Sequence, residues 1–470
     1  MPEAAIDVNS YLAGGEYDVW PDQAFSGRPD REVHAVSESK SVERLPQSHL
    51  GRRVTPPVCA HDCSTVVRNS IPCGPRASAG LAATHRLPFK PRLTPVSSLA
   101  TGTDLDFLRS SSPNVGEEKT RSSIGIADLF AGCGAMTVGA IEGARRAGVA
   151  AELLLAVDHW LPALEVIEST FEIDSDRVAG LDLAGVLEDG AATDGAETEK
   201  RILDQAADAD LLLAGPPCQG HSALNNHTRH DDTRNDLYLA VARVARFVKP
   251  RAVIVENVRG VGRDRRKAVG RCAEALEELG YKVESQTLDL NALGAPQRRI
   301  RHVLVATQTK AFDFEGLPEQ PGRTVKWAIQ DLKGIDGRTL FDTASAPSKE
   351  NKKRMKWLLD KDEFDLPNPM RPKCHHDAHS YVSMYGRLRW DEPAQTITSG
   401  FGSMGQGRFV HPDAARTITP HEAARLQFLP DFMDFSHVEQ RTELATMIGN
   451  AVPPIMTMVI VQALIEQGLL

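Results

Sequence analysis

The sequence lacks long apolar runs and a leader segment. No stretch approaches the roughly 20 apolar residues that a helix needs to span a bilayer. The first five residues, MPEAA, have neither the basic nor the apolar region of a secretory signal. These absences argue against a secreted or membrane-spanning protein, and we expect a cytoplasmic location.

Cysteine and net positive charge are also scarce. An odd number of widely scattered cysteines argues against a disulfide framework and for a reducing compartment, in which one thiol can be kept for chemistry. The 54 Lys and Arg are outnumbered by 63 Asp and Glu, and this balance does not indicate a nucleic-acid-binding protein. A local basic face on an acidic protein can still bind phosphates. The cysteines are Cys59, Cys63, Cys73, Cys133, Cys218, Cys272 and Cys374.

The composition that remains is typical of a globular protein, with 41% hydrophobic and 25% charged residues. Its 470 residues are enough for two or three domains. Residues 1–122 are rich in Ser, Pro, Arg and Gly and show no sustained periodicity, so we expect a mostly disordered N-terminal extension. A small folded domain is the alternative for this segment.

Residues 123–308 alternate between strand and helix patterns. Helical patterns end at Arg146 and cover 237–248 and 267–279, and apolar runs predict strands at 124–129, 153–157, 211–214, 253–255 and 303–306. Such alternation predicts an α/β fold with a doubly wound, mostly parallel sheet.

The alternation fades after residue 308. Residues 309–385 are mixed and loop-rich, and helical patterns return at 421–427 and 452–466, within the final segment 386–470. The basic residues of the middle segment indicate either a lobe that faces polyphosphate or an ordinary solvated face. They are Lys326, Lys349, Lys352, Lys353, Arg354, Lys356, Lys361, Arg371 and Lys373.

A glycine-rich motif, IADLFAGCGAMTVG, follows the first predicted strand at Ile126–Gly139. Gly132 and Gly134 let the backbone turn sharply under a ligand before a helix begins. The spacing differs from the dinucleotide pattern G-x-G-x-x-G. The motif indicates a nucleotide-type cofactor loop, or otherwise only a tight strand-to-helix connection.

Acidic residues end the next two apolar runs. Asp158, followed by His159 and Trp160, stands where a carboxylate can accept hydrogen bonds from a ribose. Capping a helix is the alternative role for Asp158. Asp182, with Leu183, is a weaker candidate for binding an adenine amino group and face.

The stretch GPPCQGHSALN at Gly215–Asn225 carries the strongest chemical signal. A buried strand leads into a stiff Pro-Pro turn, and Cys218 follows at the carboxyl edge of a parallel sheet, where ligands bind in this architecture. Thiolate is the reactive form of cysteine, so nearby donors and positive charge would activate Cys218. A buried structural thiol is the alternative.

Charged residues near two further strands complete the predicted site. Glu256, in VIVENVRGV, can donate a proton to a ring nitrogen if burial raises its pKa. Arg299 and Arg301, in QRRIR, alternate along an extended segment and can reach one pocket. Surface ion pairing is the alternative for the arginines. Asn450, in GNAVPP, precedes the last helix as a cap or a ligand contact, and that helix must fold back against the first strands to reach the cofactor.

In this order, the motifs resemble the DNA (cytosine-5)-methyltransferase family. The resemblance covers residues 124–470 and rests on DLFAGCG, PPCQ, ENV, QRRIR, RLRWDEPAQTIT, ARTITPHEAARLQFLPD and GNAVPP. It implies a Rossmann-like, S-adenosylmethionine-dependent methyltransferase with a smaller target-recognition region at 309–385. Residues 386–470 would finish this lobe and return to the catalytic domain.

The resemblance also implies roles for individual residues. Cys218 would attack carbon 6 of a flipped-out cytosine, and Glu256 would bond ring N3 and the amino group. Arg301 would hold O2, Arg299 would help position the nucleophile, and Gln219 with Ser222 would belong to a loop that closes over the DNA. S-adenosylmethionine would be surrounded by Phe130, Gly132, Gly134, Asp158, His159, Asp182, Leu183, Pro217, Leu237 and Asn450.

The implied partner is double-stranded DNA, read at a short sequence by a monomer located at the nucleoid. A cognate restriction endonuclease encoded nearby would fit. The polar segment 220–236 would fill the gap that the flipped base leaves. Two positions depart from the family pattern: Ala135 stands where many relatives carry a third glycine, and His159 stands where an aromatic residue often meets adenine.

Other functions explain less of the sequence. A transfer-RNA cytosine-5 methyltransferase on the same scaffold is the runner-up, but the Gln-Gly-His-Ser continuation after Cys218 favours the DNA branch. A nucleotide-dependent oxidoreductase would leave PPCQ, ENV and QRRIR without roles, and an inactive DNA-binding module would not need an intact nucleophile. We predict no metal site, because the clusters at 59–73 and 374–379 lack paired C-x-x-C spacing.

Overall fold

A computed structural model describes residues 101–113, 123–181, 183, 200–217, 237–263, 267–335, 337–376 and 383–470. The chain divides into Met1–Leu93, which lies outside the described residues, and Thr94–Leu470. All the described elements belong to the second unit.

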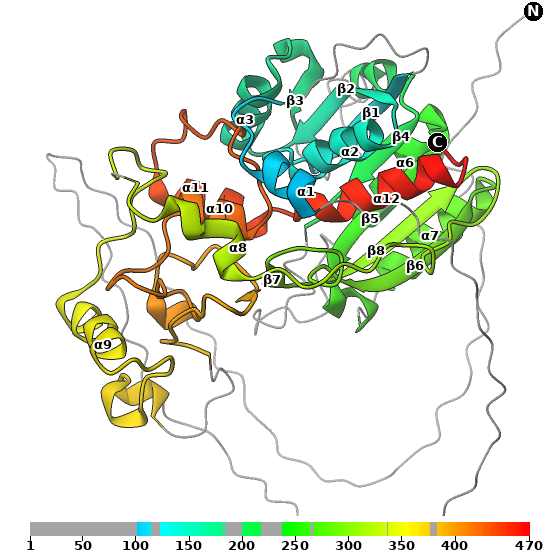
Figure 1. The fold of residues 1–470 in the computed structure, drawn as a ribbon. Coiled ribbons are helices and arrows are strands. Elements are labelled where there is room, and N and C mark those ends of the chain that lie inside the picture. Colours follow the sequence, from blue (N-terminus) through cyan, green and yellow to red (C-terminus); the bar gives the residue numbers. More distant parts are fainter. Residues whose placement is uncertain are drawn as a thin grey trace, which may run out of the picture. The chain divides into compact units, whose positions relative to one another are not determined.

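A seven-stranded sheet forms the centre of this unit (Figure 1). Six of the seven strands run in the same direction, and β8 alone runs opposite, antiparallel to both of its neighbours, β5 and β6. The mostly parallel sheet confirms the predicted fold class. The strand order is β3 (Val178–Gly180), β2 (Ala150–Asp158), β1 (Ser123–Leu129), β4 (Leu211–Ala214), β5 (Ala252–Val258), β8 (Ile300–Thr307) and β6 (Lys282–Asp289).

Helices cover both faces of the sheet, which is why its central strands read as continuous apolar runs. All four residues of β4 and the first six of β5 are buried. One face packs against α2 (Ala135–Arg146), α3 (Leu161–Phe171) and α12 (Pro454–Glu466). The opposite face packs against α6 (Leu237–Val248) and α7 (Ala268–Glu278).

The last helix returns to the start of the domain, as its predicted role requires. Gly139 and Gly143 on α2 meet the α12 backbone at Pro454 and Met458 so closely that a Cβ at either glycine would overlap it. Glycine inside a helix costs about 1 kcal/mol relative to alanine, and here it permits the close packing of α2 against α12.

The stretch Arg441–Glu466 is long and apolar enough to cross a membrane by length and composition alone, which the sequence analysis did not anticipate. It comprises two helices, α11 (Arg441–Asn450) and α12, with Ala451–Pro453 between them. Within its most apolar window, 78% of the residues are buried inside the protein. The stretch is therefore a core element of this fold.

A helix that the sequence analysis did not expect, α1 (Thr101–Leu108), lies within the segment predicted to be mostly disordered. Its Asp104 is fully buried and forms ion pairs with Arg146 of α2 and with Arg323. Arg323 in turn lies over the ring of Trp327, 4.4 Å from its centroid. The end of the extension is thus integrated into the core through buried charge, which hydrophobic periodicity does not reveal.

The remaining chain beyond Thr307 forms a lobe with few strands. Its helices are α8 (Val325–Ile329), α9 (Lys349–Asp360), α10 (Pro420–Leu426) and α11. A two-stranded parallel ladder of β7 (Gln297–Arg298) and β9 (Ala394–Gln395) joins this lobe to the sheet domain. Short 3-10 helices occupy Ser175–Arg177, Arg259–Arg263, Gln330–Leu332, Asn368–Met370, Lys373–His375 and Met404–Gln406. The division at residues 308 and 385 stays a prediction.

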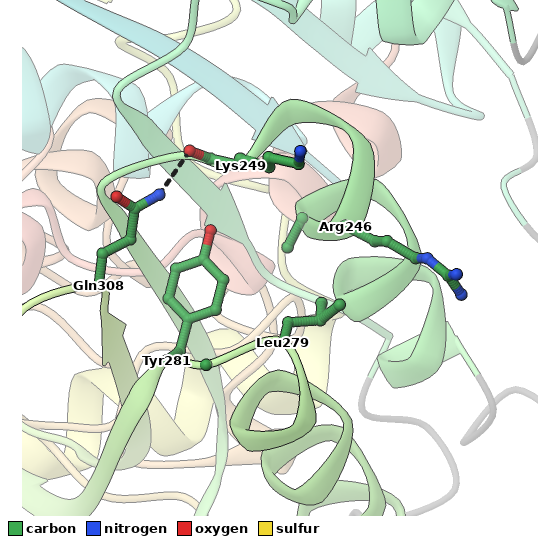
Figure 2. Close-up of a pocket in the computed structure, with 7 residues that line it drawn as sticks. Arg246, Lys249, Leu279, Tyr281 and Gln308 are labelled. Carbon is green, nitrogen blue, oxygen red and sulfur yellow. Dashed lines mark hydrogen bonds between the residues drawn. The ribbon is translucent and has the colours of Figure 1, made fainter.

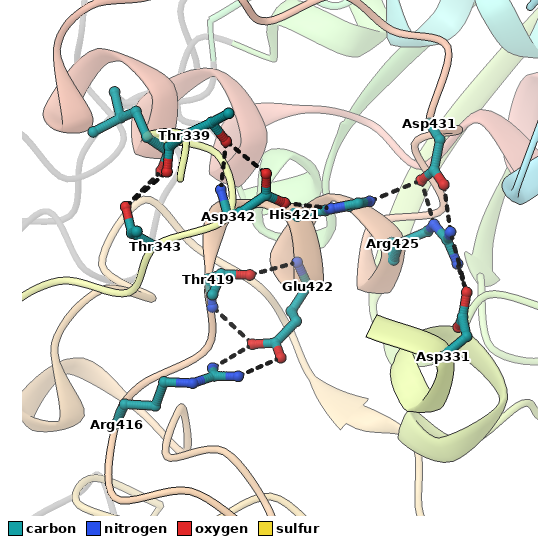
Figure 3. A network of polar contacts seen from close by, with 11 residues as sticks. Asp331, Thr339, Asp342, Thr343, Arg416, Thr419, His421, Glu422, Arg425 and Asp431 are labelled. Carbon is teal, nitrogen blue, oxygen red and sulfur yellow. Dashed lines mark hydrogen bonds and ion pairs between the residues drawn. The ribbon is translucent and has the colours of Figure 1, made fainter. Parts of the chain in front are cut away.

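A polar network around α10 stabilises the lobe (Figure 3). Thr419 and Glu422 form a capping box at the start of α10, and Arg416 donates two hydrogen bonds to the same carboxylate. His421 lies between Asp342, 2.9 Å from Nδ1, and Asp431, 3.0 Å from Nε2. The motif ARTITPHEAARLQFLPD is therefore first of all a structural element.

Candidate active site

Two of the predicted catalytic residues, Glu256 and Arg301, lie at the carboxyl edge of the parallel strands. Glu256 lies in β5 and Arg301 in the antiparallel strand β8, where Val258 pairs with Arg301. The two side chains meet, with Arg301 Nε 2.7 Å from Glu256 Oε1. The contact joins the ENV and QRRIR motifs in one place.

Glu256 is buried, with 7% of its surface exposed. Burial raises the pKa of its carboxyl above the usual value, while the positive charges of Arg301 and Arg299 lower it. Burial has the larger effect, so the carboxyl holds a proton at a higher pH than an exposed glutamate does. A carboxyl of this kind can donate a hydrogen bond to a ring nitrogen.

The turn that leads to Cys218 is tied to the same strand by Asn257. Its Nδ2 donates to the carbonyl of Pro216 at 3.0 Å, and its Oδ1 accepts from the backbone N–H of Val258. The ENV motif by itself does not reveal this link, because Pro216 lies 41 residues away in the sequence. Pro217 is half-buried at the end of the described segment, whereas Cys218 and Gln219 lie outside the described residues.

Arg299 and Arg301 differ in their surroundings. The Arg299 guanidinium donates to the carbonyls of Ile397 at 2.9 Å and Ala451 at 3.0 Å, and the residue is almost completely buried. Arg301, by contrast, pairs with Glu256. The positive charges of Arg299 and Arg301 both lower the pKa of the Glu256 carboxyl. The two arginines therefore act electrostatically on one group, although only Arg301 contacts it directly. Their separate roles stay predictions.

The glycine-rich loop after β1 turns through left-handed backbone conformations. Phe130, Gly132 and Gly134 have φ values of 60°, 54° and 80°. Gly134 is the N-cap of α2, and a Cβ there would press on Ile167. Ala135, which replaces a glycine common in the family, is the first helical residue of α2, so alanine fits this position.

Asp158 secures this loop. Its Oδ2 accepts from the backbone N–H of Gly132 at 2.9 Å, and its Oδ1 accepts from that of Trp160 at 2.9 Å. The N-cap of α3 is Trp160, so Asp158 is not the cap of that helix. The carboxylate instead fixes the ends of β1 and β2 beside each other.

Asp128, at the base of the loop, is a site residue to which the sequence analysis assigned no role. Its Oδ2 accepts from Thr137 Oγ1 at 2.6 Å, and its buried Oδ1 has no hydrogen-bond partner among the described residues. Burial raises the pKa of Asp128 to about 7, and the nearby Asp158 adds to this effect. Only the fold reveals this burial.

The other predicted cofactor residues have varied surroundings. His159 is largely exposed, and its Nδ1 lies 3.1 Å from Asp158 Oδ1. Leu183 and Leu237 are buried in the core cluster against which Phe130 packs. Asn450 is exposed as the last residue of α11; the N-cap of α12 is Pro453, so the capping role considered for Asn450 is wrong. Asp182 lies outside the described residues.

A small cavity lies at the opposite edge of the sheet (Figure 2). It is lined by Arg246, Lys249, Leu279 and Tyr281, among others. Tyr281 donates to the carbonyl of Pro250, and Gln308 donates to that of Lys249. Two of the cavity's polar side chains, Tyr281 and Gln308, therefore bond within the protein, and none of the predicted site residues borders it.

Metal ligands do not come together in the described part of the chain, where no three His, Cys, Asp or Glu side chains form a group suited to a metal ion. The cluster at 59–73 lies outside that part, and so do the Cys374 side chain and residue His379.

Known proteins are similar to this chain in sequence. The model of the family described as "C-5 cytosine-specific DNA methylase" matches residues 124–466. The type II methyltransferase M1.BsuMI of Bacillus subtilis is 44% identical over 340 residues, which cover 72% of this chain and 79% of that protein. The type II methylase M.HgiDII of Herpetosiphon aurantiacus is 31% identical over 267 residues, which cover 54% and 75%.

Solved structures show the same fold at low sequence identity. The methyltransferase EhMeth of Entamoeba histolytica aligns with a TM-score of 0.50 and 14% identity, over 74% of this chain and 99% of that one. A Spodoptera frugiperda DNMT2 mutant aligns with a TM-score of 0.50 and 15% identity, over 73% and 99%. Both similarities concern the fold alone.

Proposed function

Because the chain belongs to the C-5 cytosine-specific DNA methylases, we propose that it methylates carbon 5 of cytosine in a short duplex DNA sequence. Its role would be that of the modification enzyme of a type II restriction–modification pair. The observation that carries the proposal is the buried ion pair between Glu256 and Arg301, at the sheet edge to which the Pro-Pro-Cys turn leads.

The chemistry follows from these residue types. Carbon 5 of cytosine is a weak nucleophile, so the Cys218 thiolate adds to carbon 6 and makes carbon 5 enamine-like. The Glu256 carboxyl, whose pKa is raised by burial, donates a hydrogen bond to N3 and stabilises the charge that develops there. Carbon 5 then takes the methyl group and loses its proton to a base. The electron pair of that C–H bond restores the ring double bond and expels the Cys218 thiolate.

The cofactor site would be the loop after β1. S-adenosylmethionine, when bound, supplies a methyl group activated by a sulfonium. The loop from Phe130 to Gly134 would lie beneath it, Asp158 would face its ribose, and Asn450 would approach from α11. The buried Asp128 Oδ1, without a partner among the described residues, supports this assignment because it can accept a hydrogen bond from an ammonium group.

Access to carbon 5 and carbon 6 requires the target base to leave the stacked duplex, at a cost of a few kcal/mol. We assign gap filling to residues 220–236, with Gln219 and Ser222 in the closing loop, and sequence reading to residues 309–385. Segment 220–236 lies outside the described residues. We further propose a monomer that acts at the nucleoid in the cytoplasm, with a cognate endonuclease encoded nearby.

The test is transfer of labelled methyl from S-adenosylmethionine to unmethylated duplex DNA, followed by conversion sequencing. We expect 5-methylcytosine in one short context, no activity for Cys218→Ala, and a fall of about 10²–10⁴-fold for Glu256→Gln. Cys272→Ala is the matched control, since burial raises the pKa of Cys272 to about 12 and leaves that thiol unreactive. Transfer to transfer RNA and not to DNA, or full activity of Cys218→Ala, would refute the proposal.

A further inference from the structure

Three buried polar side chains meet where the sheet domain joins the lobe. Gln297 and Gln427 are fully buried, and Arg299 is 3% exposed. They come from β7, from the end of α10 and from the segment between β7 and β8. We call this group the Gln297–Gln427 junction. The cysteine, glutamate and arginine chemistry proposed above uses neither glutamine.

Gln427 contacts the backbone on both sides of Asn450. Its Nε2 donates to the carbonyl of Ile448 at 2.6 Å and lies 3.2 Å from that of Gly449 and 3.3 Å from that of Ala451. Its Oε1 accepts from Gln297 Nε2 at 2.6 Å. The Gln427 amide therefore forms hydrogen bonds with the segment around Asn450, a predicted cofactor residue, and with Gln297, which precedes Arg299 and Arg301 in the sequence.

The other members extend the same link. Gln297 Oε1 accepts from the backbone N–H of Ile397 at 3.1 Å, and Arg299 donates to the carbonyls of Ile397 and Ala451. Segments from the strand region, the lobe and the α11–α12 connection thus share one hydrogen-bond network. Networks of this kind fix a single arrangement when every member is satisfied.

Backbone packing at Gly449 provides independent support. A Cβ at this position would overlap the backbone of Thr398 and Ser399. The end of α11 is therefore pressed directly against the lobe segment whose residue 397 bonds to both Gln297 and Arg299. Any shift of this segment would move the backbone at Gly449 and Asn450.

We propose that Gln427 is a positioning residue that sets Asn450 for the cofactor and holds Arg299 and Arg301 in register for the base. The inference rests on the proposed cofactor site at Asn450. Loss of the amide removes the hydrogen bond to the buried Ile448 carbonyl and leaves Arg299 as the donor to that of Ala451, which favours a different path for 448–451. The affinity for the cofactor is then expected to fall even in the absence of DNA.

The test compares Gln427→Met, which keeps volume and removes the donor, with Tyr281→Phe. Tyr281 is also buried and donates one hydrogen bond, to Pro250 at 2.7 Å, but it lies at the far edge of the sheet. The readouts are the Kd of S-adenosylhomocysteine by calorimetry without DNA, the free energy of unfolding, and KM for S-adenosylmethionine against kcat.

We expect Gln427→Met to raise the Kd about tenfold, as loss of a buried hydrogen-bond donor would, and Tyr281→Phe to leave it unchanged. A Kd within twofold of wild type in Gln427→Met, at a stability loss like that of Tyr281→Phe, would show a merely structural role. If Gln427→Met does not fold, Gln427→Asn, whose shortened amide cannot span the same partners, is judged by the same criterion. A wild-type protein that binds no S-adenosylhomocysteine would overturn the proposed cofactor site and this inference together.

Discussion

At the site, the pKa of an individual side chain depends on the balance between its burial and the charges of its neighbours. Burial raises the pKa of Glu256 and Asp128, and in Glu256 two arginines oppose the effect. Burial also raises the pKa of Cys133 and Cys272 to about 12, which marks both as unreactive thiols. The same residue types thus serve different purposes, depending on what surrounds them.

His421 provides a pH-dependent contribution to stability. Burial alone would lower the pKa of this histidine, but its hydrogen bonds to Asp431 and Asp342 and the charge of Asp431 outweigh burial and raise it, against the opposing charge of Arg425. The imidazolium is therefore stabilised in the folded state. Its contribution is fully present below the unfolded pKa of about 6.5 and is lost as pH rises through the higher folded pKa.

We predict that wild type loses more stability than His421→Gln between pH 6 and pH 9. Urea unfolding at the two pH values measures the difference, and the comparison cancels other groups such as Asp128, whose raised pKa also makes stability fall with pH. Equal losses in the two proteins would show that His421 is neutral in the fold.

Among the elements, α1 joins parts of the chain that are far apart in sequence. Asp104 contacts arginines from α2 and from the segment before α8, and Arg109 pairs with Asp331 at 2.8 Å. The carbonyl of Leu108 accepts from the backbone N–H of Asp431. A domain boundary drawn at Ser123 would therefore remove a structural part of the core.

Removing the Asp104 carboxylate takes away the buried counter-charge of Arg323 and leaves Arg146 with Glu142 alone. We predict that Asp104→Asn lowers the free energy of unfolding by about 3–5 kcal/mol, as breaking a buried ion pair typically does. Asp106→Asn, on the exposed face of the same helix, is the control and should change stability by about 0.5 kcal/mol or less. Equal, small changes in both variants by urea unfolding would contradict a structural role for α1.

Helix α9 has one apolar and one basic face. Met355 and Leu358 pack into the lobe, while Lys349, Lys352, Lys353 and Lys356 recur at helical spacing on the opposite side. Lys356 pairs with Asp360 at 2.7 Å, and no carboxylate ion pair involves the other three lysines within the described residues. If the lobe faces DNA, these side chains can contact phosphates.

We predict that Lys352→Gln combined with Lys353→Gln weakens DNA binding and makes the negative slope of log K against log salt shallower by about 0.9 for each phosphate that the protein no longer neutralises. Sequence preference should stay the same, because phosphate contacts carry no base information. Lys249→Gln with Lys282→Gln, exposed at the far edge of the sheet, is the matched control. An unchanged slope in fluorescence anisotropy titrations would identify the α9 lysines as a solvated face.

For the molecule as a whole, cofactor binding and folding should be coupled. The predicted cofactor residues come from β2, the loop after β1, α6 and the end of α11, which are brought together only in the folded chain. A ligand that binds only the folded state stabilises it by about 2.7 kcal/mol at 100 times its Kd.

We predict that S-adenosylhomocysteine at this excess raises the unfolding midpoint of wild type by a few degrees. Cys218→Ala should show the same rise, because this residue lies outside the predicted cofactor set. Asp158→Ala should show little or none, since it loses the carboxylate that holds Gly132. Differential scanning fluorimetry measures these midpoints. A rise in Asp158→Ala as large as that of wild type would show that Asp158 is not part of the cofactor site.

The sequence by itself determined the fold class and the order of the chemical motifs. Strands β1, β4 and β5 and helices α2, α6 and α12 were predicted because a doubly covered parallel sheet needs continuous apolar strands and amphipathic helices between them. The direct contact of Glu256 with Arg301 was not predicted: alternation placed only Arg299 and Arg301 in one pocket, and the family resemblance alone assigned Glu256 and Arg301 to the same base. Helix α9 and strand β6 were missed because their exposed faces are strongly polar.

Tertiary structure alone decided which polar groups are buried and what they contact. Asp104, Asp128 and Gln427 stand in segments whose local pattern does not distinguish them from exposed polar residues. Their partners lie elsewhere in the chain, from nine residues away for Asp128 and Thr137 to 219 for Asp104 and Arg323. The pKa of Glu256 likewise depends on burial and on charges brought in by another strand. Periodicity records the preference of a segment for water, whereas hydrogen bonds and ion pairs across the fold depend on where every other segment lies.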